Sequence, residues 1–342
     1  VEIIADDIAA SGFDLIIVDE ATHYKNVQTR RWKSLNKLIK DDTWLWMMTG
    51  TPAAQSPLDA YGLAKLVNPT GVPRYFGSFR DQVMFKLTRF KWEVKENATE
   101  TVFNALRPAI RFTKEECLDL PEMVYIKRKV ELTPQQKKYY KELKTRMVMQ
   151  AAGEEVTAVN AAVNMNKLLQ ISAGAVYTDN GQALEFDIKH RYKVLMEAIQ
   201  ETSSKVLVFV PFKHTIGILS RRLTSDGISN AVIQGDVPVN KRTEIFRAFQ
   251  EQSDPRVLVV QPAAASHGVT LTAANTVVWW APTSSLETYL QANARIHRAG
   301  QKNKCTVVQL HGAPVEQHVY RLLDDRIDVH TKVIDLYKEL LD

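Results

Sequence analysis

The chain has 342 residues, which is enough for about two domains. Apolar residues make up 45% and charged residues 24%, as is ordinary for a globular protein, and no run of about 18 apolar residues predicts a membrane span. Cys117 and Cys305 stand far apart, which excludes a disulfide framework and a cysteine-based zinc site. The net charge of +5 permits a nucleic-acid partner but does not demand one. The acidic first residues do not resemble a signal peptide.

Short apolar runs alternate with amphipathic segments along most of the chain. The runs cover residues 15–18, 44–48, 206–210, 231–233, 257–260, 277–280 and 306–310. Strands that alternate with helices predict an α/β fold with parallel, doubly wound sheets. We therefore predict two α/β lobes, the first of them incomplete. The expected parts are 1–68 as the C-terminal part of lobe one, 69–188 as a mostly helical linker, 189–315 as lobe two and 316–342 as a helical tail.

A helix start is visible inside the linker. Thr133 is a suitable N-cap, Pro134 suits the first helical position, and Gln136 can complete a capping box. This pattern predicts a long helix that ends at about residue 152.

Two carboxylates, Asp19 and Glu20, directly follow the apolar run at 15–18. The carboxyl ends of parallel strands are where open α/β sheets bind their ligands. In a nucleotide hydrolase, the first carboxylate of such a pair holds Mg²⁺ and the second orients or activates the attacking water. A solvated acidic turn has the same appearance, so the pair alone leaves both interpretations open.

A polar turn, Thr49-Gly50-Thr51-Pro52, follows the next apolar run, about 30 residues after the acidic pair. If the two runs are neighbouring parallel strands, this turn lies at the same sheet edge as Asp19. Glycine, threonine and proline also make an ordinary turn, so the position carries more information than the composition.

Polar residues at helical spacing occur near residue 290. Ser284 and Glu287 can form a capping box, which predicts a helix over residues 285–298 that stops at Gly300. Spacings of four and three then place three side chains on one helical face: Gln291, Arg295 and Arg298. Two arginines together can bind a phosphate, although a solvated basic face is the simpler interpretation.

Small residues surround Gly268, just after the run at 257–260. Such residues let the backbone approach a ligand closely, or they form an ordinary strand-to-helix loop. Trp279 and Trp280 end the following run. We expect one of them in the core, while the other could face a cleft between the lobes.

The order of these motifs resembles the Swi/Snf-type, DNA-dependent ATPases and translocases of helicase superfamily two. The similar segments are LIIVDEATHYKN, MMTGTPAAQSPLDAYGLAKLVNP, LRPAIRFTKEECLDLP, LTPQQKKYYKEL, VLVFVPFKHTIGIL, ASHGVTLTAANTVVWWAP and YLQANARIHRAGQ. The resemblance covers about residues 13 to 310. The compact link between the lobes is similar to that of the small bacterial or bacteriophage branch, which implies a cytoplasmic protein of a bacterial or phage-infected cell.

The resemblance implies two RecA-like lobes that close on ATP and Mg²⁺ and step along double-stranded DNA. Asp19, which would hold the Mg²⁺, and Glu20 would be the catalytic residues of lobe one. Lobe two would contribute Gly268, Gln291, Arg295 and Arg298. Among these, Arg298 is our first choice for the arginine finger. Residues Thr49, Gly50 and Thr51 would couple the nucleotide state to DNA.

Contacts to DNA are harder to assign. Basic residues interleaved with aromatic ones suit a groove for the phosphate backbone, and a solvated basic surface is an equally good interpretation. The candidates are Arg89, Lys91, Arg107, Arg111 and Lys114.

One part of the family pattern is absent from these residues. A phosphate-binding loop needs Gly-Lys followed by Ser or Thr, and no glycine of the chain is followed by lysine. In the family this motif would precede residue 1. Three interpretations follow: a fragment of a longer motor, a natural DNA- or protein-binding module that does not hydrolyse ATP, or a chain whose partner supplies the missing strands. An RNA helicase of the same superfamily is a rival, although Leu120-Pro121 and the Thr133 segment favour the Swi/Snf type. We expect no ATP hydrolysis above background from these residues alone.

Overall fold

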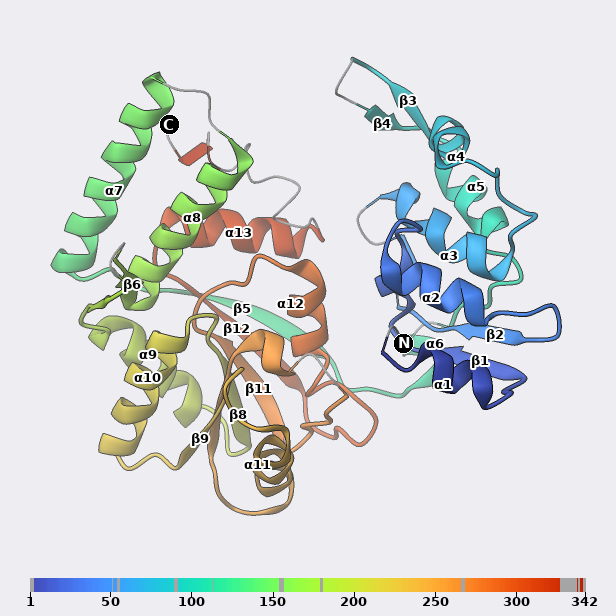
Figure 1. The fold of residues 1–342 in the computed structure, drawn as a ribbon. Coiled ribbons are helices and arrows are strands. Elements are labelled where there is room, and N and C mark those ends of the chain that lie inside the picture. The colour runs from blue at the N-terminus through green and yellow to red at the C-terminus, as the bar shows by residue number, and fades with distance from the viewer. Residues whose placement is uncertain are drawn as a thin grey trace. The chain divides into compact units, whose positions relative to one another are not determined.

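The computed structural model describes residues 3–50, 52–53, 56–88, 92–112, 114–153, 157–178, 181–265, 268–326, 337 and 339–340. The chain divides into two compact units, Val1–Thr113 and Lys114–Asp342 (Figure 1). The division falls inside the segment 69–188 that the sequence predicts as a linker. Within the described ranges, no helix is long and apolar enough to cross a membrane.

Unit 1 contains a small parallel sheet and several short helices. Strand β1 (Leu15–Val18) pairs with β2 (Trp44–Met47), and their register runs from Leu15 opposite Trp44 to Val18 opposite Met47. A hairpin of β3 (Met84–Lys86) and β4 (Trp92–Val94) is antiparallel. The helices are α1 (Ala5–Ala10), η1 (Ala21–Tyr24), α2 (Arg30–Leu38), η2 (Pro57–Asp59), α3 (Ala60–Val67), α4 (Phe76–Val83) and α5 (Ala98–Ala105).

The β1–β2 sheet is packed on one face. Side chains alternate between the faces of a strand, so Ile16 and Val18 face the same way. These two join the cluster that contains Leu35 of α2 and Leu63 of α3. Apolar side chains of the opposite face are 38–71% exposed: Leu15, Ile17, Trp44 and Trp46.

Unit 2 is built on a six-stranded sheet in the order β5-β12-β11-β8-β10-β9. Every neighbouring pair in it is parallel, which confirms the predicted α/β fold with a parallel sheet. The strands are β5 (Met123–Lys129), β8 (Lys205–Phe209), β9 (Asn230–Ile233), β10 (Val257–Val260), β11 (Ala274–Trp279) and β12 (Cys305–His311). All but β5 coincide with the predicted apolar runs. A separate hairpin joins β6 (Ala175–Tyr177) and β7 (Ala183–Glu185).

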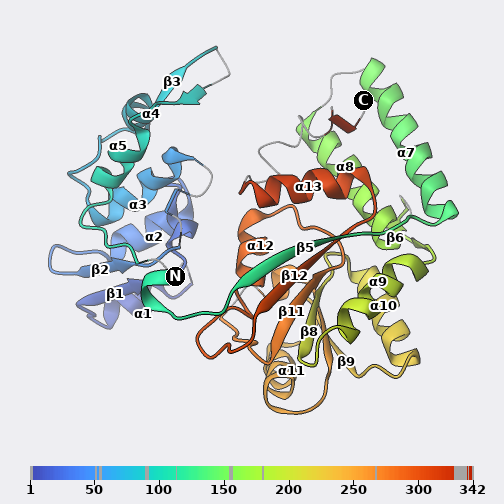
Figure 2. The same cartoon turned by 180° about the vertical axis from the view of Figure 1, so that it is seen from behind.

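Helices cover both faces of this sheet, as Figures 1 and 2 show. One face packs on α9 (Lys189–Gln200) and α10 (Lys213–Ser225). The other packs on α7 (Pro134–Gly153), α8 (Ala158–Ala173), α11 (Val239–Glu251), α12 (Leu286–Asn293) and α13 (Pro314–Asp324). The remaining short helices are α6 (Lys114–Cys117) and η3 (Pro262–Ala265). Tyr337 and Leu340 are buried in the same core, so these two residues pack in unit 2.

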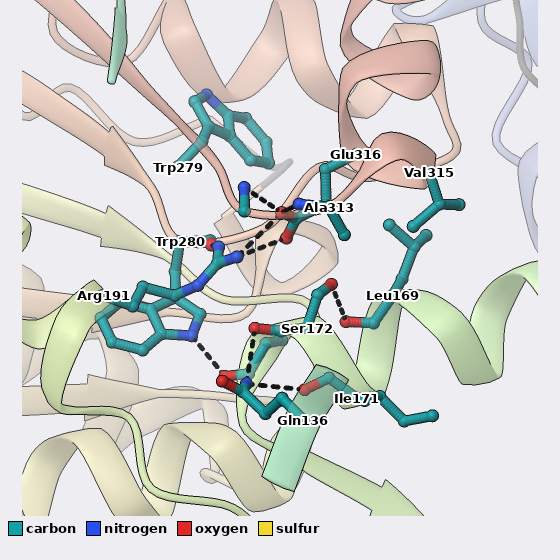
Figure 3. Close-up of polar contacts among 12 residues, drawn as sticks. Gln136, Leu169, Ile171, Ser172, Arg191, Trp279, Trp280, Ala313, Val315 and Glu316 are labelled. Atoms are coloured by element: carbon teal, nitrogen blue, oxygen red, sulfur yellow. Dashed lines mark hydrogen bonds and ion pairs between the residues drawn. The ribbon is translucent and has the colours of Figure 1, made fainter. Parts of the chain in front are cut away.

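Helix α7 begins where the capping pattern predicts. The backbone N–H of Thr133 donates to Gln136 Oε1 at 3.0 Å, and the N–H of Gln136 donates to Thr133 Oγ1 at 3.4 Å. Gln136 Nε2 also donates to the carbonyls of Ile171 (2.8 Å) and Ser172 (3.2 Å) near the end of α8 (Figure 3). The cap therefore fixes the start of α7 and its contact with α8.

A buried ion pair joins α9 to α13. Arg191 Nη2 donates to both carboxylate oxygens of Glu316 at 2.8 Å, and the same guanidinium donates through Nη1 to the carbonyl of Trp280 (Figure 3). Trp279 and Trp280 are both fully buried, and their indole N–H groups donate inside the unit. The expectation that one of them faces a cleft is therefore wrong.

Candidate functional site

The carboxyl end of the β1–β2 sheet brings the acidic pair beside the predicted polar turn. Beyond the strands, the N–H of Met48 donates to the carbonyl of Val18 at 2.8 Å, and the N–H of Ala21 donates to Met48 O at 2.9 Å. The two chains thus remain side by side, and Asp19 and Glu20 lie next to residues 48–50. The predicted common edge is confirmed for Thr49 and Gly50. Thr51 lies outside the described residues.

The backbone at Glu20 has an unusual conformation. Its φ of 51° and ψ of 51° are left-handed, a region that residues other than glycine seldom adopt. The N–H of Glu20 donates to Asp19 Oδ1 at 2.9 Å, and helix η1 begins at the next residue. Strained backbone of this kind is concentrated at functional sites, so the turn agrees with a binding role for the pair.

Asp19 and Glu20 are both exposed to solvent. Mg²⁺ is commonly held by one or two carboxylates together with substrate phosphates and water, so Asp19 fits as a ligand of a nucleotide-bound ion. Across the described residues, no group of three His, Cys, Asp or Glu could hold a metal ion.

Helix α3 supports the loop that follows the acidic pair. A Cβ at Gly62 would stand 2.2 Å from the carbonyl oxygen of Lys25 and 2.6 Å from that of Tyr24, so only glycine fits at this close approach. Trp32 Nε1 donates to the Gly62 carbonyl at 2.8 Å, and Lys25 Nζ lies 3.3 Å from Asp59 Oδ2. Gly62 was not singled out from the sequence, because its requirement comes from a neighbour distant in the chain.

The predicted helix over about residues 285–298 begins one residue later than expected, and its predicted end is wrong. Helix α12 covers Leu286–Asn293, and its N-cap is Ser285, whose Oγ accepts from the N–H of Thr288 at 3.2 Å. Gln291 lies on the helix, but Arg295 and Arg298 lie in the turn after it. The three side chains therefore do not share one helical face. The carbonyl of Arg295 accepts from Leu271 N at 2.9 Å, a tertiary contact outside the reach of local sequence rules.

The two arginines have different surroundings. Arg295 is only 3% exposed, and its Nη1 donates to the carbonyl of Val269 at 3.3 Å. It therefore binds the loop that contains Gly268. Arg298 is half-buried, and its guanidinium has no hydrogen bond or ion pair with any described residue. Of the two, Arg298 is the better placed to bind an external anion.

The other predicted nucleotide contacts in unit 2 also have defined positions. Gly268 is exposed and has a φ of 61°, and no atom would lie within 4 Å of an added Cβ. The positive φ, and not crowding by neighbouring atoms, is what favours glycine there. Gln291 Nε2 donates to Glu287 Oε1 at 3.2 Å, one turn earlier on α12.

Gln301 holds the arginine-bearing turn against the sheet. Its Nε2 donates to the carbonyls of Thr272 (3.3 Å), Ala274 (2.9 Å) and Ile296 (3.0 Å), and the residue is 6% exposed. One buried amide thus joins the start of β11 to the turn. The sequence places Gln301 at the end of the segment YLQANARIHRAGQ but does not show this role.

Two of the predicted DNA contacts can be placed. Arg107 and Arg111 are exposed on the irregular segment after α5, and the Arg107 guanidinium lies 5.0 Å from the centre of the Phe103 ring. Arg89 and Lys91 lie outside the described residues, as does the side chain of Lys114, the first residue of α6.

Two family models match the chain in succession. The model of the SNF2-related domain matches residues 3–176, just over half of the chain, and the model of the helicase conserved C-terminal domain matches residues 190–300. The match covers both units and agrees with the motif order in the sequence.

Curated relatives are similar over nearly the full chain. An uncharacterised ATP-dependent helicase of Mycoplasma genitalium is 27% identical over 315 residues, which cover 89% of this chain and 29% of the relative. The SWI/SNF-related matrix-associated actin-dependent regulator of chromatin subfamily A-like protein 1 of Xenopus tropicalis is 24% identical over 339 residues, 95% of this chain and 34% of the relative. The chain thus spans about a third of the length of these relatives, or less.

Solved structures share the fold. The C-terminal part of the Fun30 ATPase domain has a TM-score of 0.52 at 17% identity, over 66% of this chain and 99% of that one. The SWI2/SNF2 ATPase core of Sulfolobus solfataricus, solved in complex with double-stranded DNA, has a TM-score of 0.52 at 20% identity, over 99% of this chain and 74% of that one. The fold is that of ATPase cores with RecA-like lobes.

Proposed function

Because the chain belongs to the SNF2-related family, we propose that it is core machinery of an ATP-dependent motor that translocates on double-stranded DNA. The observation that carries the proposal is the sheet edge in unit 1, where Asp19 and Glu20 lie beside Thr49 and Gly50. The similar Sulfolobus core was solved on double-stranded DNA, which supports a duplex as the track.

In this proposal each unit supplies part of the chemistry. Asp19 would hold the Mg²⁺ that accompanies ATP, and Glu20 would orient the attacking water. From unit 2, Arg298 would stabilise the charge that develops on the phosphates, with Gly268 and Gln291 as further nucleotide contacts. Arg295 is better described as a positioning residue, because it is buried and binds the loop carbonyl of Val269.

Coupling to DNA would begin at the same edge. Thr49 and Gly50 follow β2, directly beside the acidic pair, so a change in the bound nucleotide could reach them, and through them the next residue of the chain, Thr51, by one shared sheet edge. Arg107 and Arg111 would bind phosphates, because arginine pairs with phosphate bidentately and needs no particular base. Binding is therefore expected to be independent of DNA sequence and sensitive to salt.

Hydrolysis also needs a group that cradles the ATP phosphates. No glycine among the 342 residues is followed by lysine, so these residues contain no Gly-Lys-Ser/Thr loop. We propose that a working motor takes this loop from residues other than these. We also place the protein in the small bacterial or bacteriophage branch, since the link between its lobes carries no large insertion.

Two assays on the 342-residue chain test the proposal: duplex DNA binding by fluorescence anisotropy at low and high salt, and ATP hydrolysis with and without DNA. We expect salt-sensitive binding and no hydrolysis above background. Absence of DNA binding at low salt would refute the proposed track. Hydrolysis by this chain alone would refute the proposed need for a further loop. Tighter binding to RNA than to duplex DNA would instead support an RNA helicase.

Variants then test the roles in a protein that includes the phosphate loop. Glu20→Gln should abolish hydrolysis and leave ATP binding intact. Arg298→Ala should lower turnover about a thousandfold, the typical effect of losing an arginine finger. Arg247→Ala, at an exposed arginine of α11, is the matched control and should leave turnover unchanged. Near-normal turnover in the Glu20 or Arg298 variant would remove that residue from the site.

A further inference from the structure

Helix α7 carries most of the net positive charge of the chain. It contains five basic residues and one acidic residue, a net charge of +4, whereas the whole chain has a net charge of +5. The basic residues are Lys137, Lys138, Lys141, Lys144 and Arg146. All are exposed except Lys144, which is half-buried. The mild overall charge therefore hides a strongly basic helix.

These basic side chains lack the acidic partners that many others in unit 2 have. Among the residues that the structure describes, no carboxylate forms an ion pair with any of the five. By contrast, Nζ of Lys189, Lys213 and Lys304 lies 3.6, 2.8 and 2.8 Å from the carboxylates of Asp187, Asp236 and Glu122 respectively. Like charges one turn apart destabilise a helix, and Lys137, Lys141 and Lys144 follow one another at this spacing, whereas Glu142 stands one turn from Lys138 and Arg146 instead. Such a local conflict without compensation is typical of a functional surface.

Three of the lysines form a straight row. Lys137, Lys141 and Lys144 are separated by four and three residues, which places them along one stripe of the helix, about 10 Å long at 1.5 Å per residue. The side chains of Tyr140 and Met147 are buried in the core of unit 2. Figures 1 and 2 both show α8 between α7 and α13, so α7 is the outer helix of this layer.

We propose that this row, the α7 stripe (Lys137, Lys141 and Lys144), binds the phosphate backbone of nucleic acid. The inference rests on the proposed function and adds to it a contact surface on unit 2, separate from Arg107 and Arg111. A lysine ammonium is a flexible point charge that can follow phosphates but does not read bases. The stripe should therefore add affinity and salt dependence without sequence preference.

The test compares two triple variants with the same change in net charge. Lys137→Gln, Lys141→Gln and Lys144→Gln together remove the stripe, and glutamine keeps the helix propensity. Lys189→Gln, Lys213→Gln and Lys304→Gln remove three lysines that have acidic partners. Both variants and the unchanged chain are titrated with the same duplex from 50 to 200 mM salt, after circular dichroism has shown that each is folded.

Loss of three phosphate contacts should reduce the slope of log K against log salt by about 2.7. The affinity ratio of the unchanged chain to the stripe variant should then be roughly 40-fold larger at 50 mM than at 200 mM salt. The control variant should keep the slope of the unchanged chain. An unchanged slope in the stripe variant, or equal losses in both variants, would overturn the stripe and leave DNA binding in place. If the unchanged chain binds no duplex, the proposed function fails. Equal competition by polyglutamate of the same total charge would show a general polyanion surface and overturn the assignment to nucleic acid.

Discussion

Replacing Glu316 with alanine should lower the free energy of unfolding of unit 2 by about 3–5 kcal/mol, the usual cost of breaking a buried ion pair. The Glu316 side chain is fully buried, and its carboxylate accepts from Arg191 at 2.8 Å, from Gly312 N at 2.6 Å and from Ala313 N at 3.0 Å. Removing it leaves the Arg191 guanidinium, itself 3% exposed, buried without a countercharge.

The loss of about 3–5 kcal/mol is large compared with the free energy of unfolding of a whole domain. A domain is typically stable by about 5–15 kcal/mol, so Glu316→Ala would remove roughly a fifth or more of the stability of unit 2. Exchanging both partners for apolar residues avoids the lone charge, and such exchanges are often neutral or stabilising. The double variant Arg191→Met with Glu316→Leu should therefore be clearly more stable than Glu316→Ala.

Urea unfolding measures these differences. Trp279 and Trp280 are fully buried in unit 2, so their fluorescence reports on its unfolding. Gly312→Ala tests the Arg191–Glu316 ion pair in a second way. The Cβ of the new alanine would stand 2.4 Å from Arg191 Nη2 and collide with the guanidinium. The control is Gly217→Ala in α10, where the nearest atom is 3.5 Å away. A cost below about 1 kcal/mol for Glu316→Ala, or a double variant as unstable as it, would contradict the buried-charge reasoning.

Two further predictions concern one residue in each unit. In unit 1, Gly62→Ala should destabilise by about 1–3 kcal/mol, as overpacking does, because its Cβ would collide with the backbone of Lys25. Gly77→Ala in α4, where nothing lies within 4 Å, should be harmless, and equal thermal unfolding midpoints for the two would refute the clash. In unit 2, burial lowers the pKa of His311 below 6.5. An unfolded chain then binds more protons than the folded one, so this contribution to stability is present above pH 6.5 and is lost as the pH falls through the lowered pKa. Urea unfolding of the chain and of His311→Gln between pH 7 and pH 5 should show a smaller loss in the variant, and identical pH profiles would refute it.

Most strands of the unit 2 sheet could be predicted from the sequence. The strand that could not be predicted is β5, and its composition shows why. Strands β8 to β12 are apolar runs, whereas β5 contains Lys127 and Arg128 and does not read as a core strand. Those charges are neutralised by ion pairs with Asp324 and Glu201, which are far away in the chain. The reason why β5 can contain these charges is apparent only in the folded structure, where the two acidic side chains form ion pairs with it.

The same limit explains the arginine turn. Ser284, Glu287 and Gly300 predict a longer helix by local rules, but α12 ends at Asn293. The backbone beyond it makes tertiary hydrogen bonds, among them the one from Leu271 N to Arg295 O at 2.9 Å. Local rules cannot foresee which backbone groups a distant loop will engage.

The residues that sequence motifs single out and the residues that position them are therefore different. Asp19 and Glu20 could be named from their place after a strand, but the loop behind them requires the close approach of Gly62. Arg298 could be singled out from the resemblance of its segment to the family, yet its turn is held by three hydrogen bonds from Gln301. Under the proposed function, these supports would hold the charged groups at a fixed place within each unit. Substitution of Gly62 or Gln301 should therefore impair the proposed activity as much as substitution of the charged residues does. The cause would be displacement of those charged groups, and not the loss of a direct contact to ATP.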